Sequence, residues 1–374
     1  MPDHKRFLIV QFGNQFFIDH NIPFGLASAS GLQGEVADAI VDIWYSLGIE
    51  FIKKWVDDFV LFRFPHHSLL NLSQEPQYTY PYDLALAKHL ISPLGVPWHT
   101  SKGQDFAFDF SYVGFFWDLI HKSVSLTLEK CEKHLAKITS FIQLASHSQF
   151  LKNDVESLNG SLSHISFIYL RGRTHLRNLI EFIKSFENNF TRRWAPTSVL
   201  KDLEWWRIML MQPNFIRSLV PPPMTIDHGI WVDGSTDWGI GILFQGHWDA
   251  WRTLPCWKDK GRDIGWLEAV AVELIINVLL LSNFTNMDVL IRGDNQGVIG
   301  AFKRGRSRNK MTNEVIQRSE ALMDSSNLSI TLMYVETSIN LADPISRGIL
   351  PPLSQRISLP YHIPQAISQY FYHA

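Results

Sequence analysis

The stretch of sequence that decides the fold covers residues 229–253 and reads GIWVDGSTDWGIGILFQGHWDAWRT. Its three apolar runs, Gly229 to Val232, Gly239 to Gln245 and His247 to Thr253, are separated by short turns that contain glycine. Apolar runs of this length between glycine-containing turns predict three adjacent strands. The next apolar stretch, Trp266 to Leu281, is longer and is predicted to be a helix.

Helices and strands alternate after this point. We expect a strand at Met287 to Arg292, helices at Gln296 to Phe302 and Thr312 to Met323, and a strand at Leu328 to Val335. Three strands followed by alternating helices and strands indicate a mixed sheet covered by helices. The fold class is therefore α/β (α+β), with this mixed-sheet domain in the C-terminal half.

Acidic residues stand at the ends of these elements. Asp233 follows a strand, Glu268 lies near the start of the long helix, Asp294 closes a strand, and Asp343 opens the last helix. Side chains at element ends project into the space beside a sheet, where such carboxylates can hold two divalent cations roughly 3.5–4 Å apart. Each acid alone also fits a helix cap or a surface charge, and Glu273 competes with Glu268 as the inward-facing acid.

A second acidic feature lies in the N-terminal half. Asp57 and Asp58 are adjacent inside the apolar run Trp55 to Phe62. Neighbouring like charges are costly, and a divalent cation is one way to neutralise them. A solvated turn between two strands is the other interpretation, because aspartate is common in turns. We expect a hairpin over Lys53 to Phe64 with the pair near its tip.

Composition and charge limit the function classes. The 374 residues carry a net charge of −2, so a bulk basic field of the kind seen in many nucleic-acid-binding proteins is absent from the sequence. Local basic clusters remain, and both are candidates for phosphate contacts or for solvated loops. The candidate phosphate-binding residues are Arg171, Arg173 and Arg177 in one cluster and Lys303, Arg304, Arg306 and Arg308 in the other.

The two cysteines, Cys131 and Cys256, are far apart, so a disulfide framework is not expected and a reducing intracellular compartment fits. No membrane span or secretory signal is predicted. The run Pro221-Pro222-Pro223 predicts a domain boundary. The expected domains are residues 1–125, a largely helical segment at 126–220, the mixed-sheet domain at 225–348, and an irregular tail at 349–374.

The acidic motifs of the C-terminal domain resemble those of the ribonuclease H fold, in the version found in retrotransposon polymerases. The matching stretches are Val232 to Ser235, Leu267 to Ala271, Arg292 to Gln296 and Asn340 to Arg347. The resemblance implies hydrolysis of the RNA strand of an RNA–DNA hybrid with two Mg²⁺ ions, Mn²⁺ being an alternative. It makes Asp233, Glu268, Asp294 and Asp343 the catalytic metal ligands. The sequence departs from the pattern of cellular and many retroviral relatives at one point, because no histidine lies between Val335 and Asp343.

The N-terminal half resembles the palm of reverse transcriptases. Pro23 to Leu26 followed by a helix, then Trp55 to Asp58, and later Phe110 to Phe115 carry this similarity, and the helical segment is similar to a thumb or connection region. The resemblance makes Asp57 and Asp58 metal ligands. The family also places a metal-binding aspartate on an earlier palm strand, and neither Asp3 nor Asp19 is a convincing substitute.

The whole chain thus resembles an N-terminally truncated retrotransposon reverse transcriptase/ribonuclease H polyprotein. The expected activity is Mg²⁺-dependent cleavage of RNA in RNA–DNA hybrids, with primer extension by this chain alone not expected. The alternative is a non-catalytic nucleic-acid-binding relic of such a polymerase. The expected partners are an RNA–DNA hybrid or another nucleic acid, without a membrane, and a second chain that supplies the missing polymerase segment is a further interpretation.

Overall fold

A computed structural model describes residues 9–18, 28–66, 79–96, 98–99, 103–212, 215–358 and 363–374. It divides into two compact units, Met1–Lys122 and Ser123–Ala374. The motif at Pro23 to Leu26 and the candidate residues Asp3 and Asp19 lie outside the described residues.

The first unit is built around one amphipathic helix, α1, whose apolar residues recur at helical spacing. Ala37, Ile40 and Trp44 share one buried face, and the Trp44 indole Nε1 donates a hydrogen bond to the Ala87 carbonyl oxygen at 2.8 Å. Phe59 of β4 packs edge-on against Trp44. The elements of this unit are β1 (Ile9–Phe12), β2 (Gln15–Ile18), α1 (Ala29–Ser46), β3 (Ile52–Trp55), β4 (Asp58–Leu61), α2 (Leu84–Leu90), a 3-10 turn (Ser92–Leu94), β5 (Asp109–Tyr112) and β6 (Phe115–Asp118).

The first unit contains the hairpin predicted over Lys53 to Phe64, which is formed by β3 and β4. β1 and β2 also pair antiparallel. A further hairpin is formed by β5 and β6. The chain reverses at residues 113–114, where both backbone φ angles are positive, and a two-residue turn of this kind joins antiparallel strands.

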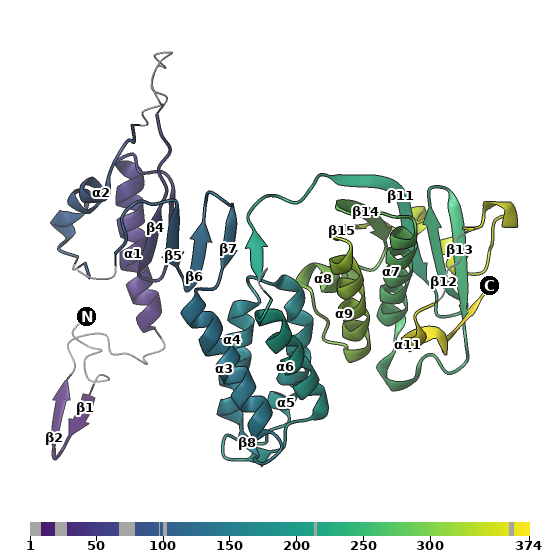
Figure 1. Cartoon of the computed structure of the whole chain (residues 1–374), viewed down its shortest axis with the longest axis horizontal. Coiled ribbons are helices and arrows are strands. Elements are labelled where there is room, and N and C mark those ends of the chain that lie inside the picture. Colours follow the sequence, from purple (N-terminus) through teal and green to yellow (C-terminus); the bar gives the residue numbers. More distant parts are fainter. Residues whose placement is uncertain are drawn as a thin grey trace. The chain divides into compact units, whose positions relative to one another are not determined.

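The second unit begins with a helical segment. Its core is a cluster of fully buried side chains from α4, α5 and α6, which include Leu158, Leu179 and Trp206. The segment consists of β7 (Ser123–Ser125), α3 (Leu128–Leu144), β8 (Phe150–Leu151), α4 (Lys152–Ile165), the 3-10 segment η3 (Leu170–Leu176), α5 (Arg177–Lys184), β9 (Arg192–Arg193), α6 (Thr197–Leu210) and β10 (Ile216–Ser218). β7 pairs with β10, so the first and last strands of the segment lie together (Figure 1).

The remainder of the second unit is a six-stranded mixed sheet in the order β15-β14-β11-β12-β13-β16. β11, β14 and β15 are parallel, whereas β12, β13 and β16 continue the sheet antiparallel. The elements are β11 (Thr225–Gly234), β12 (Gly239–Phe244), β13 (His247–Thr253), α7 (Ile264–Leu281), β14 (Met287–Gly293), α8 (Gln296–Arg304), α9 (Lys310–Ser325), β15 (Leu328–Tyr334), α10 (Asp343–Ser346), α11 (Gln365–Ser368) and β16 (Phe371–His373), with 3-10 turns at Asp259–Gly261, Thr337–Ile339 and Leu353–Gln355.

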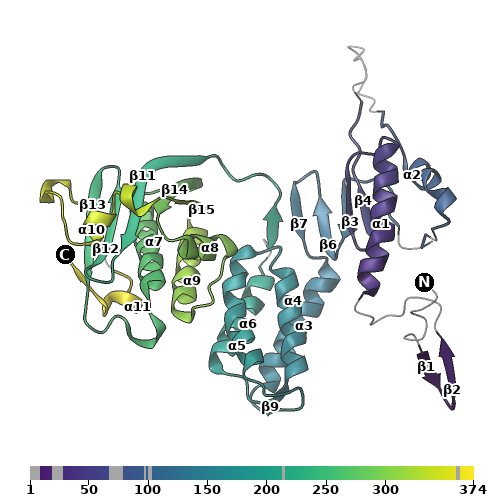
Figure 2. The same cartoon turned by 180° about the vertical axis from the view of Figure 1, so that it is seen from behind.

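The two faces of β12 contact different helices. Ile240 and Ile242 join the large apolar core formed with α7, while Leu243, on the alternate face, packs with Ile345 of α10. α7 is apolar almost all round because it is enclosed by the sheet and α9 (Figures 1 and 2). By length and composition α7 is also the one helix among the described residues that would suffice to cross a membrane, but 67% of its span is buried in this core.

The prediction of an irregular tail after residue 348 is wrong in part. Phe371–His373 forms β16, which pairs antiparallel with Trp251, Arg252 and Thr253 of β13 and adds an edge strand to the sheet. His373 reaches the buried carboxylate of Asp249 at 2.9 Å. A three-residue strand that follows a proline-rich stretch carries too little alternation to be recognised in the sequence.

Candidate active site

The parallel pairing of β11 and β14 brings Asp233 and Asp294 together. Trp231 is paired with Arg292, and each aspartate lies two residues further along its strand direction. Because carboxyl ends of parallel strands meet at one edge of a sheet, both side chains reach the same place. Asp233 is 4% exposed and its carboxyl group shares a hydrogen bond with that of Asp294.

Glu268 reaches the two aspartates from the second turn of α7. The helix begins after Asp263, whose side chain caps it by accepting a hydrogen bond from the Trp266 backbone N–H at 2.9 Å. A Cβ atom at Gly234 would lie 3.0 Å from Glu268 Cγ and 3.2 Å from its backbone nitrogen. Glycine at position 234 therefore permits the close approach of strand and helix that places Glu268 at the site.

Glu273, the competing acid on the same helix, has a different role. It is fully buried and accepts two hydrogen bonds from Arg318 of α9, at 2.7 and 2.8 Å. This ion pair fastens α7 to α9. Glu268, whose surroundings include Asp233 and Asp294, is the acid that faces the site.

Asp343 is brought in by α10, which packs against β12 next to Asp233. Gly241 stands opposite Asp233 in the β11–β12 pair, so both residues face α10. A Cβ atom at Gly241 would lie 2.5 Å from the Ser346 backbone nitrogen, which means that the helix backbone touches the strand directly. The Ser346 hydroxyl, one helical turn after Asp343, donates a hydrogen bond to Asp233 Oδ2 (α10 is labelled in Figure 2).

Neutral side chains orient the carboxylates. The Asn340 amide donates to Asp233 Oδ1 at 3.3 Å, so both oxygens of Asp233 have a donor. The Thr337 hydroxyl donates to Asp294 Oδ2 at 2.6 Å, and Asn295 hydrogen-bonds Glu268. These donors restrain the carboxylates, since turning the buried Asp233 or the half-buried Asp294 and Glu268 away would break a hydrogen bond.

Crowding and burial shift the protonation of the cluster. Burial, reinforced by the charges of Asp294 and Asp343, raises the pKa of Asp233 to about 7, although the Ser346 hydrogen bond acts in the opposite direction. Burial likewise raises the pKa of Glu268 to about 8, with the charges of Asp294, Asp233 and Asp263 adding to it and the Asn295 hydrogen bond opposing it. Clusters of carboxylates with raised pKa values are typical of functional sites.

Asp343 is the acid that has a cationic partner. Arg347 Nε lies 2.9 Å from both Asp343 oxygens, and Arg347 Nη2 lies 2.8 Å from Oδ1. Among the described residues, no three acidic, histidine or cysteine side chains form a group that could hold a metal ion. The four predicted acids therefore lie near one another without forming a metal-binding group in this structure, and Asp343 is directed at Arg347.

Asp57 and Asp58 lie in the first unit, at the tip of the β3–β4 hairpin. Asp57 belongs to the two-residue turn, Asp58 is the first residue of β4, and both are exposed. The position at the tip was predicted. Of the two interpretations, the solvated turn describes the surroundings of the pair here, and their role as metal ligands stays a prediction.

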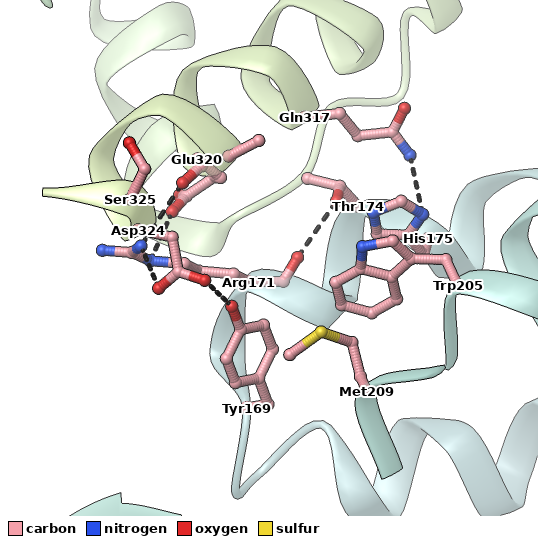
Figure 3. A pocket seen from close by; sticks show the side chains of 11 residues that line it. Tyr169, Arg171, Thr174, His175, Trp205, Met209, Gln317, Glu320, Asp324 and Ser325 are labelled. Carbon is pink, nitrogen blue, oxygen red and sulfur yellow. Dashed lines mark hydrogen bonds and ion pairs between the residues drawn. The ribbon is translucent and has the colours of Figure 1, made fainter. Parts of the chain in front are cut away.

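The basic cluster at residues 171–177 differs from the expectation of free phosphate-binding groups. Arg171 lies between two acids of α9, with Nε 3.0 Å from Glu320 and Nη1 2.6 Å from Asp324 (Figure 3). Arg177 is paired with Glu181 on its own helix. Both charges are paired with acids in this structure, and the assignment of Arg171 and Arg177 as nucleic-acid-binding residues stays a prediction. Arg173 is half-buried, and the nearby charges of Arg306 and Arg217 add to burial in lowering its pKa.

Arg171 also borders a cavity of about 320 Å³ between η3, α6 and α9. Figure 3 shows the Tyr169 hydroxyl directed at Asp324 and the Trp205 ring beside His175, which stacks on it with ring centroids 3.8 Å apart. The contacts around this cavity join the helical segment to the mixed-sheet domain. The 171–177 segment is therefore a structural contact inside the second unit.

The other basic cluster stays exposed. Lys303 and Arg304 end α8, and Arg306 and Arg308 follow in the loop before α9. Their exposure is compatible with both earlier interpretations, the phosphate clamp and the solvated loop. Their assignment as nucleic-acid-binding residues remains a prediction.

Sequence reasoning missed the residues that orient the acids. Asn340, Ser346 and Arg347 belong to a stretch recognised only for Asp343, and Thr337 and Asn295 had no assigned role. Spacing was a usable signal for two of them, because residues three and four positions after Asp343 lie one helical turn away and near its side chain. For Thr337 and Asn340, only the fold brings the donors to the aspartates.

No protein-family model matches the chain, and no curated protein matches it. One solved structure that is similar is the foamy viral protease-reverse transcriptase in complex with an RNA/DNA hybrid, with 16% sequence identity and a TM-score of 0.41. The alignment covers 98% of this chain and 44% of that protein, so this chain spans less than half of its length.

Proposed function

We propose that the chain is a metal-dependent ribonuclease that hydrolyses the RNA strand of RNA–DNA hybrids and leaves a 3′ hydroxyl. The observation that supports the proposal is the proximity of Asp233 and Asp294, at the carboxyl ends of two parallel strands, to Glu268 of α7 and Asp343 of α10. The substrate class rests on the resemblance of the motifs around these acids to those of retrotransposon ribonuclease H domains.

The donor set suits divalent cations, Mg²⁺ or Mn²⁺, by its chemistry. All of the candidate ligands are carboxylate oxygens, the type that Mg²⁺ prefers. Burial, with a smaller contribution from the neighbouring carboxylates, raises the pKa values of Asp233 and Glu268, and a bound cation would stabilise their ionised forms. Asp343 would join the set by turning from Arg347. When bound, two such ions activate a water molecule and stabilise the leaving oxygen of a phosphodiester.

The protein's own side chains supply orientation. Asn340 and Ser346 hold both oxygens of Asp233, and Thr337 holds one oxygen of Asp294, so each aspartate keeps a fixed direction as charge in the site changes. This preorganisation avoids rearrangement during the reaction. The exposed residues Lys303, Arg304, Arg306 and Arg308 would contact the hybrid backbone through its phosphates, without reading its sequence.

The test is a cleavage assay with purified full chain and Mg²⁺ on four substrates: an RNA–DNA hybrid, duplex RNA, duplex DNA and single-stranded RNA. We expect cleavage of the RNA in the hybrid only, abolished by a chelator and by Glu268→Gln. Asp58→Asn, which changes an exposed acid outside the cluster, is the matched control and should cleave normally. If hybrid is bound without any cleavage, the non-catalytic nucleic-acid-binding alternative replaces this proposal.

A further inference from the structure

The ion pair between Arg347 and Asp343 occupies both oxygens of a carboxylate assigned above to the metal site. The two residues are four positions apart, at the start and just past the end of α10, and their contacts measure 2.8 to 2.9 Å. A fork-like contact of this kind satisfies the lone pairs through which a carboxylate would bind a cation. The guanidinium therefore stands in the position of a counter-ion to Asp343.

Arg347 is well placed to leave this position. Its side chain is 52% exposed, whereas that of Asp343 is 20% exposed. The guanidinium also lies in the field of Asp233 and Asp237, so it compensates part of the charge of the whole cluster. Exposed ion pairs contribute little net stability, which means that exchanging this pair for another partner costs the fold little.

We propose that Arg347 is an exchangeable counter-ion: it neutralises Asp343 in the free protein, gives this carboxylate up to a divalent cation, and then contacts a phosphate of the substrate. This inference rests on the proposed function. It accounts for the orientation of Asp343, whose carboxylate is directed at the Arg347 guanidinium. Arginine suits the second role because its planar fork binds phosphate as well as carboxylate.

The exchange has a measurable signature. A positive charge about 5 Å from a divalent cation opposes its binding, and in a solvent-exposed site the Coulomb energy corresponds to about a tenfold change in the dissociation constant. Removal of the guanidinium should therefore tighten metal binding about tenfold. The same change should raise the KM for the hybrid several-fold, because a phosphate contact is lost. A residue that merely supports the fold would weaken both.

The experiment is a calorimetric titration of Mn²⁺ and of Mg²⁺ into the full chain without nucleic acid, followed by steady-state cleavage of the hybrid. The variants are Arg347→Gln, Arg347→Lys and Asp294→Asn, and the control is Arg252→Gln, which removes an exposed arginine on β13. We expect tighter metal binding and a higher KM for Arg347→Gln. Arg347→Lys, which keeps the charge without the fork, should lie between it and the wild type.

The outcomes separate this inference from the proposed function. The proposed function fails if the wild type cleaves no hybrid and if Asp294→Asn does not change its metal binding. If the wild type binds metal and cleaves, but Arg347→Gln binds metal equally or more weakly, the counter-ion inference alone is overturned. Thermal melting of each variant establishes that it is folded, and Arg347→Lys gives the same comparison if the glutamine variant is not.

Discussion

Replacing Asp233 by asparagine should change how stability depends on pH. Asp233 is 4% exposed, and its pKa is raised from 3.8 to about 7. Between these two values the folded state holds a proton that the unfolded chain releases, so this group makes the protein less stable as the pH rises. The contribution of Asp233 to the free energy of unfolding is fully present below its pKa in the unfolded chain. It is lost as the pH rises through its pKa in the folded protein. From pH 5 to pH 8 the loss is about 2–3 kcal/mol.

The assay is urea unfolding of the metal-free full chain at several pH values, followed by circular dichroism. Asparagine cannot ionise, so the free energy of unfolding of Asp233→Asn should rise relative to wild type by about 2–3 kcal/mol between pH 5 and pH 8. Any cost of the substitution that does not depend on pH cancels in this comparison. Adding Mg²⁺ at pH 8 should stabilise the wild type more than the variant, because a ligand stabilises the state that binds it.

Asp227→Asn is the matched control, since Asp227 lies on the same strand, β11, but is exposed. Its hydrogen bonds with Arg292 lower its pKa, so its stability contribution is present above its unfolded value and is lost only as the pH falls below that value. The difference between this variant and wild type should stay flat from pH 5 to pH 8. A flat difference for Asp233→Asn as well, or one of opposite sign, would refute a buried carboxylate with a raised pKa.

Three further predictions concern packing and charge. Gly241→Ala should lower both the melting temperature and the rate of hybrid cleavage. The added Cβ would lie 2.5 Å from the Ser346 backbone nitrogen and push α10 from the sheet. An unchanged melting temperature would contradict this contact. Arg171→Ala should destabilise the second unit by about 1–3 kcal/mol in chemical unfolding, since it leaves Glu320 without its cation, yet it should not alter the salt dependence of hybrid binding. Combined replacement of Lys303, at the end of α8, and of Arg306 and Arg308, in the following loop, by glutamine should reduce the slope of log affinity against log salt by about one per lost phosphate contact. An unchanged slope would show that these cations contact solvent only.

The sequence predicted the elements that carry the acids, because their patterns are local. The strands around Asp233, the helix that contains Glu268 and the short helix that begins at Asp343 lie within a few residues of the expected positions. Glycine at 234 and 241 was visible in the sequence, but its purpose was not. Only the fold shows that each lets two backbones touch beside the site.

Long-range pairing could not be read from the sequence. Arg171 looked like a free cation, since its partners Glu320 and Asp324 lie about 150 positions away in the chain. Glu273 competed with the predicted site residue Glu268, and only the packing of α7 against α9 shows that Glu273 is paired with Arg318. The role of Arg347 likewise depends on the fold, because the fold places its ion pair with Asp343 near the other acids. In each case, the partner that the tertiary structure places beside a charged side chain determines whether that side chain is a candidate ligand, part of a structural ion pair or a surface charge.

The measurement that tests the central claim most directly is the rate at which the chain cleaves the RNA strand of a labelled RNA–DNA hybrid in Mg²⁺, compared with Asp294→Asn. The four-carboxylate site predicts cleavage by the wild type and a large loss of cleavage in the variant, since the Asp294 carboxylate lies near both Asp233 and Glu268. Absence of cleavage by the folded wild type, or equal cleavage by Asp294→Asn, would contradict it.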